Sequence, residues 1–193
     1  GLPAYAWLHV PKAEGKTPGT VICPPVSQYQ PGPAKPSWGK LVIFAAVHGG
    51  DIAQCPPEVP FDYMKSDITS RENYKLRYAY CCLVRCFDII KNYEKCDGKV
   101  SVTGGSQGAG LSLVLAGLRP VTDVSGAAVA LCRIDWTVLG HTRWGPQCPP
   151  GEDPQKIAAI VSYYDPARFT HRIRCPKVKL CFGLFDWCAP AEG

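Results

Sequence analysis

The sequence predicts an α/β fold in which a mostly parallel central sheet lies between two layers of helices. Short apolar runs of strand length alternate along the chain with segments of helical periodicity. One such run, residues 40–47, is almost entirely apolar, as expected of a strand that is buried on both faces. The 193 residues fit one domain, residues 1–193, and 46% hydrophobic against 19% charged residues is a globular composition.

The individual elements follow from periodicity and from turn residues. The predicted strands are residues 5–10, 19–23, 40–47, 124–131 and 177–183, together with a β-branched run that begins at Lys99. Apolar residues recur every three or four positions in residues 73–92, which predicts an amphipathic helix packed on the sheet. A shorter helix is expected over residues 155–163. Residues 52–72 are expected to form a loop, and residues 133–151 an insertion near the functional site.

Charge and cysteine content exclude several classes of function. The net charge of +5 comes from scattered Lys and Arg residues, so no nucleic-acid partner is expected. No apolar run reaches membrane-spanning length, so no membrane partner is expected either. The eleven cysteines are odd in number and form no C-x-x-C pair, which excludes zinc-ribbon and thioredoxin-like sites. Cys23, Cys132 and Cys181 adjoin apolar runs, Cys82 and Cys86 share a helical face, and all five are expected to be buried reduced thiols in a cytoplasmic protein.

The most informative motif is Gly104-Gly-Ser106-Gln-Gly108, which lies between a β-branched run and an apolar run of helical length. A G-x-S-x-G motif in this strand–turn–helix context predicts a serine nucleophile at a strained turn. The backbone N–H of Gln107, at the start of the helix, would then face an oxyanion formed on the attacked carbonyl. The alternatives are a simple glycine-rich turn or a phosphate-binding loop, but the spacing of known phosphate motifs is absent here.

The partners of such a serine follow it along the chain in α/β-hydrolases, first an acid and then a histidine. Asp186 comes directly after the predicted strand of residues 177–183 and is the candidate acid, with a turn or helix-cap aspartate as the alternative. The candidate base is missing. The four histidines, His9, His48, His141 and His171, all precede Asp186, and a non-catalytic role is expected for each.

Two segments compete for the loop that supplies the second oxyanion donor. His48-Gly49-Gly50 follows a buried strand and is similar to the oxyanion loop of lipase-like esterases. Pro24-Pro-Val26-Ser27 follows the preceding strand and is the other candidate.

From Tyr5 to Glu192 the sequence resembles the acetyl xylan esterase and cephalosporin C deacetylase family of α/β-hydrolases. The segments that carry the resemblance are Ala6-Trp-Leu-His-Val-Pro-Lys12, Gly104-Gly-Ser-Gln-Gly-Ala-Gly-Leu-Ser-Leu113, Leu131-Cys132, Ser162-Tyr-Tyr-Asp165, Arg172-Ile-Arg-Cys-Pro176, Gly183-Leu-Phe-Asp186 and Cys188-Ala-Pro190.

The resemblance implies Ser106 as nucleophile, Asp186 as acid, and oxyanion donors from the backbone of Gln107 and of the loop near Val26 or Ser27. In this register His48 belongs to the loop of the following strand. The family removes acetyl groups from sugars or similar small esters, needs no cofactor and commonly forms oligomers. A homo-oligomer and a small-molecule or oligosaccharide ester substrate are therefore the expected partners.

The sequence departs from the family pattern in two places. The segment Pro24-Pro-Val-Ser-Gln28 stands where the family has a His-Gly-aromatic-Gly-Gly type of run. The chain also ends seven residues after Asp186, so we expect it to be part of a longer protein whose catalytic histidine lies beyond Gly193.

The expected function is that of a serine carboxylesterase acting on acetylated carbohydrate or a similar small ester. Trp144 and Trp187 are candidates for its substrate pocket, with core or interface aromatics as the alternative. Other α/β-hydrolases of the peptidase or dienelactone hydrolase type, and a non-catalytic hydrolase-like binding protein, remain as alternatives.

Overall fold

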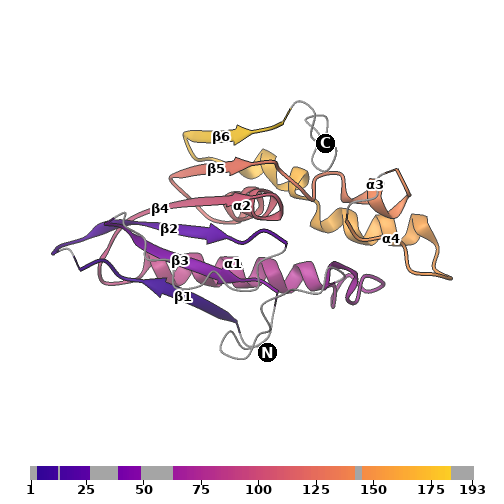
Figure 1. Cartoon of the computed structure of the whole chain (residues 1–193), viewed down its shortest axis with the longest axis horizontal. Coiled ribbons are helices and arrows are strands. Elements are labelled where there is room, and N and C mark those ends of the chain that lie inside the picture. Colours follow the sequence, from indigo (N-terminus) through magenta and orange to yellow (C-terminus); the bar gives the residue numbers. More distant parts are fainter. Residues whose placement is uncertain (1–3, 13, 27–38, 49–62, 142–144, 184–193) are drawn as a thin grey trace.

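The structure is a computed structural model that describes residues 4–12, 14–26, 39–48, 63–141 and 145–183. Six strands form one sheet in the order β1-β3-β2-β4-β5-β6 (Figure 1). Their bounds are β1 Tyr5–His9, β2 Thr17–Cys23, β3 Leu41–Ala46, β4 Cys96–Gly105, β5 Asp123–Ala127 and β6 Lys177–Cys181. β1 is antiparallel to β3, and every other neighbouring pair is parallel, which confirms the mostly parallel sheet.

Two long helices pack on the sheet, and two shorter α-helices lie beyond the carboxyl ends of its strands (Figure 1). The α-helices are α1 Lys75–Lys91, α2 Gln107–Leu118, α3 Ile134–Val138 and α4 Pro154–Val161, and the 3₁₀ helices are η1 Tyr63–Lys65, η2 Ser162–Tyr164 and η3 Pro166–Arg172. None of the helices in these described ranges has both the length and the apolar character needed to cross a bilayer.

Four predicted segments differ from the observed elements. The strand predicted over residues 124–131 ends at Ala127, because Ala128 adopts a positive φ of 50° that breaks the extended conformation. The last strand ends at Cys181 rather than at residue 183. The segment of residues 133–151 contains the short helix α3, and part of the loop predicted over residues 52–72 forms η1.

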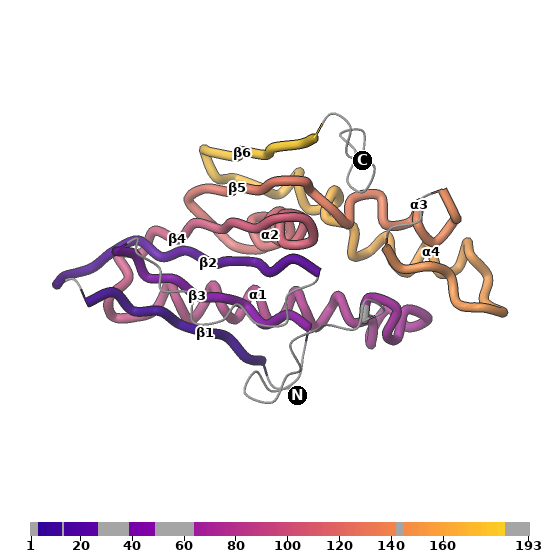
Figure 2. Tube along the Cα trace, viewed as in Figure 1, coloured from indigo at the N-terminus to yellow at the C-terminus, as the bar shows by residue number. Residues whose placement is uncertain are grey.

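Because the strands are parallel, their carboxyl ends bring distant parts of the chain together along one edge of the sheet. In the strand register Cys23 at the end of β2 pairs with Gly104 near the end of β4, and Gly104 in turn pairs with Gly126 of β5. Figure 2 follows the chain from β5 past this edge into α3 and α4. In open α/β sheets ligands bind outside the carboxyl ends of the strands, so this edge is where a site is expected.

The two long helices cover the sheet differently. α1 and α2 contact one another as well as the strands, so they lie side by side on one face. α1 is amphipathic and buries one stripe, whereas nearly all of α2 from Gln107 to Ala116 is buried. Leu111 and Leu115 of α2 are fully buried, and each contributes about 1.5–3 kcal/mol relative to an exposed side chain. α2 is therefore fixed in the core of the protein.

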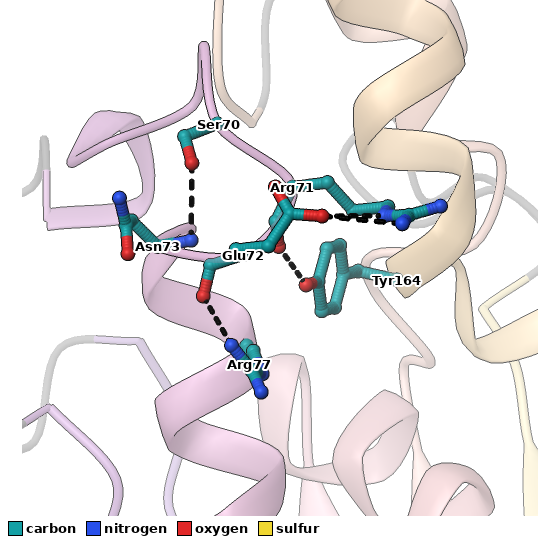
Figure 3. Close-up of polar contacts among 6 residues, drawn as sticks. All are labelled: Ser70, Arg71, Glu72, Asn73, Arg77 and Tyr164. Carbon is teal, nitrogen blue, oxygen red and sulfur yellow. Dashed lines mark hydrogen bonds and ion pairs between the residues drawn. The ribbon is translucent and has the colours of Figure 1, made fainter. Parts of the chain in front are cut away.

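A cluster of hydrogen bonds joins the segment before α1 to η2 (Figure 3). The Tyr164 hydroxyl donates to the carbonyl of Arg71, and the Tyr80 hydroxyl donates to the carbonyl of Tyr164. Arg77 Nη1 donates to the carbonyl of Glu72 at 2.6 Å. The two tyrosine hydrogen bonds attach η2, which follows α4, to α1 and to the segment before it. The partners in these two bonds lie about ninety positions apart in the chain.

Candidate active site

Ser106 forms a sharp turn between the last residue of β4, Gly105, and the first residue of α2, Gln107. Its backbone angles, φ 52° and ψ −121°, lie in a region that residues with a Cβ rarely occupy. Such strain persists only where surrounding contacts enforce it, and it is the conformation required of a nucleophile at a strand-to-helix turn.

Two glycines allow strand and helix to approach at this turn. A Cβ atom on Gly104 would lie 2.4 Å from the backbone carbonyl carbon of Gly108. A Cβ atom on Gly108 would lie 2.2 Å from the carbonyl oxygen of Cys23 at the end of β2. Gly104 and Gly108, the first and last glycines of the G-x-S-x-G motif, are thus required by packing. Gly108 brings α2 directly against the end of β2.

The segment that follows β5 holds the backbone of Ser106 from the other side. The Ser106 N–H donates to the carbonyl of Ala127 at 2.9 Å, and the Ala130 N–H donates to the carbonyl of Ser106 at 3.2 Å. Hydrogen bonds at both the N–H and the carbonyl of Ser106 therefore fix the turn. The Ser106 side chain is half-exposed at the carboxyl ends of the strands.

The side chain of Gln107 connects the ends of two neighbouring strands to α2. Its Nε2 lies 3.4 Å from the carbonyl oxygen of Pro24, after β2, and 3.3 Å from Nε2 of His48, after β3. Gln107 is buried, with 1% of its surface exposed. The residue whose backbone N–H is the predicted oxyanion donor thus also contacts the loop that is predicted to carry the second donor. Val26 of that loop is half-buried.

The imidazole of His48 is neutral in this environment. Burial, and to a lesser extent the positive charge of Lys75, lowers the pKa of His48 to about 4. A neutral imidazole keeps one ring nitrogen as an acceptor. Since the Gln107 amide nitrogen can only donate, His48 Nε2 is the acceptor of this pair. His48 is therefore suited to hold the Gln107 side chain, and the sequence did not predict this contact.

Cys23, whose carbonyl faces Gly108 of the serine turn, is not a competing nucleophile. Cys23 lies at the end of β2, and burial raises the pKa of its thiol to about 12. Burial likewise raises the pKa of Cys86 to about 12 and that of Cys132 to about 11. The prediction of buried cysteines is confirmed for Cys23, Cys82 and Cys86, whereas Cys132 is only half-buried. It is wrong for Cys181, which is exposed because β6 is an edge strand of the described sheet.

Comparison with known proteins shows what this chain is similar to. A family model described as acetyl xylan esterase (AXE1) matches residues 53–133, a range that includes the Ser106 turn. Acetyl esterase Axe7A of Xylanibacter ruminicola is 31% identical over 207 residues, which cover 96% of this chain. Both matches confirm the resemblance to acetyl xylan esterases that the sequence indicates. The chain spans 46% of the length of that relative.

Two solved structures confirm the predicted α/β-hydrolase fold of this chain. An acetyl xylan esterase from Paenibacillus sp. R4 superposes with a TM-score of 0.80 at 24% identity, over 98% of this chain and 67% of that one. Acetyl xylan esterase 1 from Thermoanaerobacterium sp. JW/SL YS485 gives a TM-score of 0.77 at 23% identity, over 97% of this chain and 66% of that one.

The four histidines lie in different parts of the fold. His9 pairs with Val42 near the amino end of β3, at the edge opposite to Ser106. His171 is exposed in η3, whose residue Phe169 packs against the carboxyl-terminal part of α2. His141 follows α3 and lies against the ring of Trp136. His48 is the histidine that contacts the residue after Ser106.

Several predicted site residues lie outside the described residues. These are Ser27, Trp144, Asp186 and Trp187. The structure brings together Ser106, Gln107 and the residues before Val26, and the acid, the pocket tryptophans and the second half of the oxyanion loop stay predictions.

Proposed function

We propose that this chain is the nucleophile-bearing part of a serine carboxylesterase that removes acetyl groups from acetylated carbohydrates or similar small esters. The observation that carries the proposal is the strained Ser106 turn between β4 and α2, in a chain that resembles acetyl xylan esterases. The substrate class follows the names of its relatives, which are an acetyl esterase and acetyl xylan esterases.

The reaction divides into two acyl-transfer steps. The Ser106 oxygen attacks the acetyl carbonyl carbon, and its proton passes to a histidine base that we place beyond Gly193. The tetrahedral oxyanion accepts hydrogen bonds from the backbone N–H of Gln107 and of the loop at Val26 or Ser27. The base returns the proton to the leaving sugar oxygen, and water then releases acetate from the acyl-enzyme. Asp186 orients the base and stabilises its protonated form.

The first test is covalent labelling of the full-length natural protein with a serine-directed phosphonate. We expect one phosphonyl adduct in the wild type, none after Ser106→Ala, and a loss of p-nitrophenyl acetate hydrolysis of at least about a thousandfold in that variant. Ser66→Ala is the matched control, because Ser66 is exposed in a turn before α1. Unchanged hydrolysis in Ser106→Ala would exclude Ser106 as the nucleophile.

Substrate panels separate the alternatives. Hydrolysis of peptide amides in preference to acetylated xylan would indicate a peptidase of the same fold. A wild-type protein that neither reacts with the phosphonate nor hydrolyses esters would indicate a non-catalytic binding protein, an outcome favoured by the unusual Pro24-Pro25 segment after β2.

We also propose a reducing, cytoplasmic setting. The nine described cysteines are all free thiols, which supports this proposal. Maleimide labelling of the protein as isolated from its natural source tests it, because disulfide-bonded cysteines would stay unlabelled.

A further inference from the structure

The first two residues of α2 are anchored to the ends of two different strands. Gly108 lies against β2, since a Cβ atom on it would lie 2.2 Å from the carbonyl oxygen of Cys23 and 3.1 Å from that of Pro24. The side chain of Gln107 reaches further, to the end of β3, where its Nε2 lies 3.3 Å from Nε2 of His48. The start of the helix that follows the predicted nucleophile is thus held at two points.

The carbonyl of Pro24 fixes the orientation of the Gln107 amide. A carbonyl oxygen only accepts hydrogen bonds, so the end of the amide that faces it at 3.4 Å is the NH2 group. The same nitrogen carries a second hydrogen, for which His48 Nε2 is the acceptor. A neutral imidazole that accepts at Nε2 carries its proton on Nδ1. The contact therefore selects one tautomer of His48.

This amide group connects the two predicted oxyanion donors. One donor is the backbone N–H of Gln107 itself, which belongs to the N–H groups that point out of the start of α2. The other lies in the loop after β2, in which Val26 follows Pro24 by two residues. Because the Gln107 side chain binds the Pro24 carbonyl, it links the loop to the helix. His48 restrains the same side chain from the end of β3.

Both partners of the restraint are buried. Gln107 is 1% exposed and His48 is 4% exposed. Water has little access to such a site, so a lost hydrogen bond is not replaced by one to solvent. Removal of the acceptor at His48 would therefore leave a buried donor on Gln107, which must move to find another partner.

We propose that His48 is a positioning residue for the oxyanion hole: its imidazole holds the Gln107 side chain and thereby sets the two backbone donors in the geometry that binds the oxyanion. The inference rests on the proposed esterase function and deepens it. His48 acts through Gln107, without contact to the substrate, and it is not the general base of the reaction.

The experiment compares two substitutions of His48 in the full-length protein. His48→Leu removes the acceptor, whereas His48→Gln places a carbonyl oxygen at about the position of Nε2 and can still accept from Gln107. We expect His48→Leu to lower kcat for p-nitrophenyl acetate by about tenfold to a hundredfold, with KM changed less than twofold. His48→Gln should keep kcat within about threefold of the wild type.

Two further measurements show whether His48 acts through Gln107. A trifluoromethyl ketone binds a serine esterase as a hemiketal whose oxyanion occupies the oxyanion hole, so its inhibition constant should rise in His48→Leu by the factor by which kcat falls. Gln107→Met keeps the backbone N–H but has no donor on its side chain. It should lose as much kcat as His48→Leu, and the double variant should lose no more than either single variant.

Thr20→Val is the matched control. Thr20 of β2 is buried, and its hydroxyl lies 2.9 Å from that of Ser101 on β4, so the substitution also breaks a polar contact between distant parts of the chain. It should lower the free energy of unfolding and keep kcat within twofold of the wild type.

The outcomes separate this inference from the proposed function. A wild type without esterase activity or phosphonate labelling overturns the esterase proposal, and this inference with it. In an active wild type, the positioning role alone is overturned if kcat survives His48→Leu, falls equally in His48→Gln or Thr20→Val, or falls further in the double variant. If His48→Leu does not fold, as judged by circular dichroism, Gln107→Met decides, and a kcat equal to that of the wild type then overturns the inference.

Discussion

Gln107 Nε2 lies 3.3 Å from His48 Nε2, so the residue after the predicted nucleophile contacts the end of β3, 59 positions earlier in the chain. Because an amide nitrogen only donates, this contact requires an unprotonated imidazole nitrogen. Protonation of His48 would place two donors against each other in a buried site. The contact is therefore compatible with the neutral form of His48. Burial favours this form over the protonated one.

The first prediction concerns stability against pH. The pKa of His48 is about 4 in the folded protein, against 6.5 for an ordinary histidine, so the unfolded chain binds the proton more tightly. The free energy of unfolding should therefore fall as the pH is lowered from about 6.5 to about 4, by up to about 3 kcal/mol from this group. Urea unfolding at a series of pH values measures the effect, and His48→Gln should remove this part of it.

A second histidine provides the control for that measurement. His171 is exposed in η3, and His171→Gln should leave the pH dependence of unfolding as in the wild type. If His48→Gln shows the same loss of stability between pH 6.5 and pH 4 as the wild type, the dependence arises from other groups.

The second prediction concerns Gly108, a glycine of α2 that lies against the backbone of β2. Replacement of a glycine inside a helix by alanine ordinarily stabilises a protein by about 0.5–1 kcal/mol. Gly108→Ala should instead destabilise by about 1–3 kcal/mol, because its Cβ would lie 2.2 Å from the carbonyl oxygen of Cys23. The new methyl group would also push the end of β2 away from α2, so esterase activity should fall with stability.

Gly105→Ala is the control for the motif. A Cβ on Gly105 would meet nothing within 4 Å, although Gly105 directly precedes Ser106. Its thermal unfolding should stay close to that of the wild type. Equal destabilisation by the two substitutions would show that the close approach of α2 and β2 is not what requires Gly108.

The sequence predicted the sheet and the serine turn because both depend on local signals. Apolar runs predict the strands, and the G-x-S-x-G motif predicts the turn. The glycines of this motif are required by contacts with the backbone around the turn. The contact between Gln107 and His48 was missed, since it joins residues far apart in the chain. A signal was present: His48 and Pro24 both follow apolar runs, and parallel strands end at one edge of a sheet.

The strained segment after β5 was beyond what the sequence could predict. Ala128 and Leu131 have positive φ angles, but neither is a residue that favours them. Their conformation is imposed by tertiary contacts, including the hydrogen bond from the Ala128 N–H to the carbonyl of Cys181.

The third prediction compares two buried tyrosines that pack edge to face, Tyr74 and Tyr164. The Tyr164 hydroxyl donates to the carbonyl of Arg71 (Figure 3). The Tyr74 hydroxyl is buried and has no hydrogen-bond partner among the described residues. Tyr164→Phe should lower the free energy of unfolding by about 1 kcal/mol, and Tyr74→Phe should leave it unchanged or raise it. Urea unfolding of both variants checks this, and a larger loss in Tyr74→Phe would contradict it.

The fourth prediction tests the strain beside the nucleophile with the smallest possible change. Ala128 has φ 50°, a conformation that glycine adopts without a steric penalty. Ala128→Gly should raise the free energy of unfolding by up to about 1 kcal/mol, since relief of strain exceeds the added entropy of the unfolded chain. Its neighbour Ala127, at the end of β5, is the control. Ala127→Gly should lower stability by about 0.5–1 kcal/mol, as glycine does in a strand. Opposite signs in the two urea titrations would locate the strain at Ala128, whereas equal losses would show that the backbone there is relaxed.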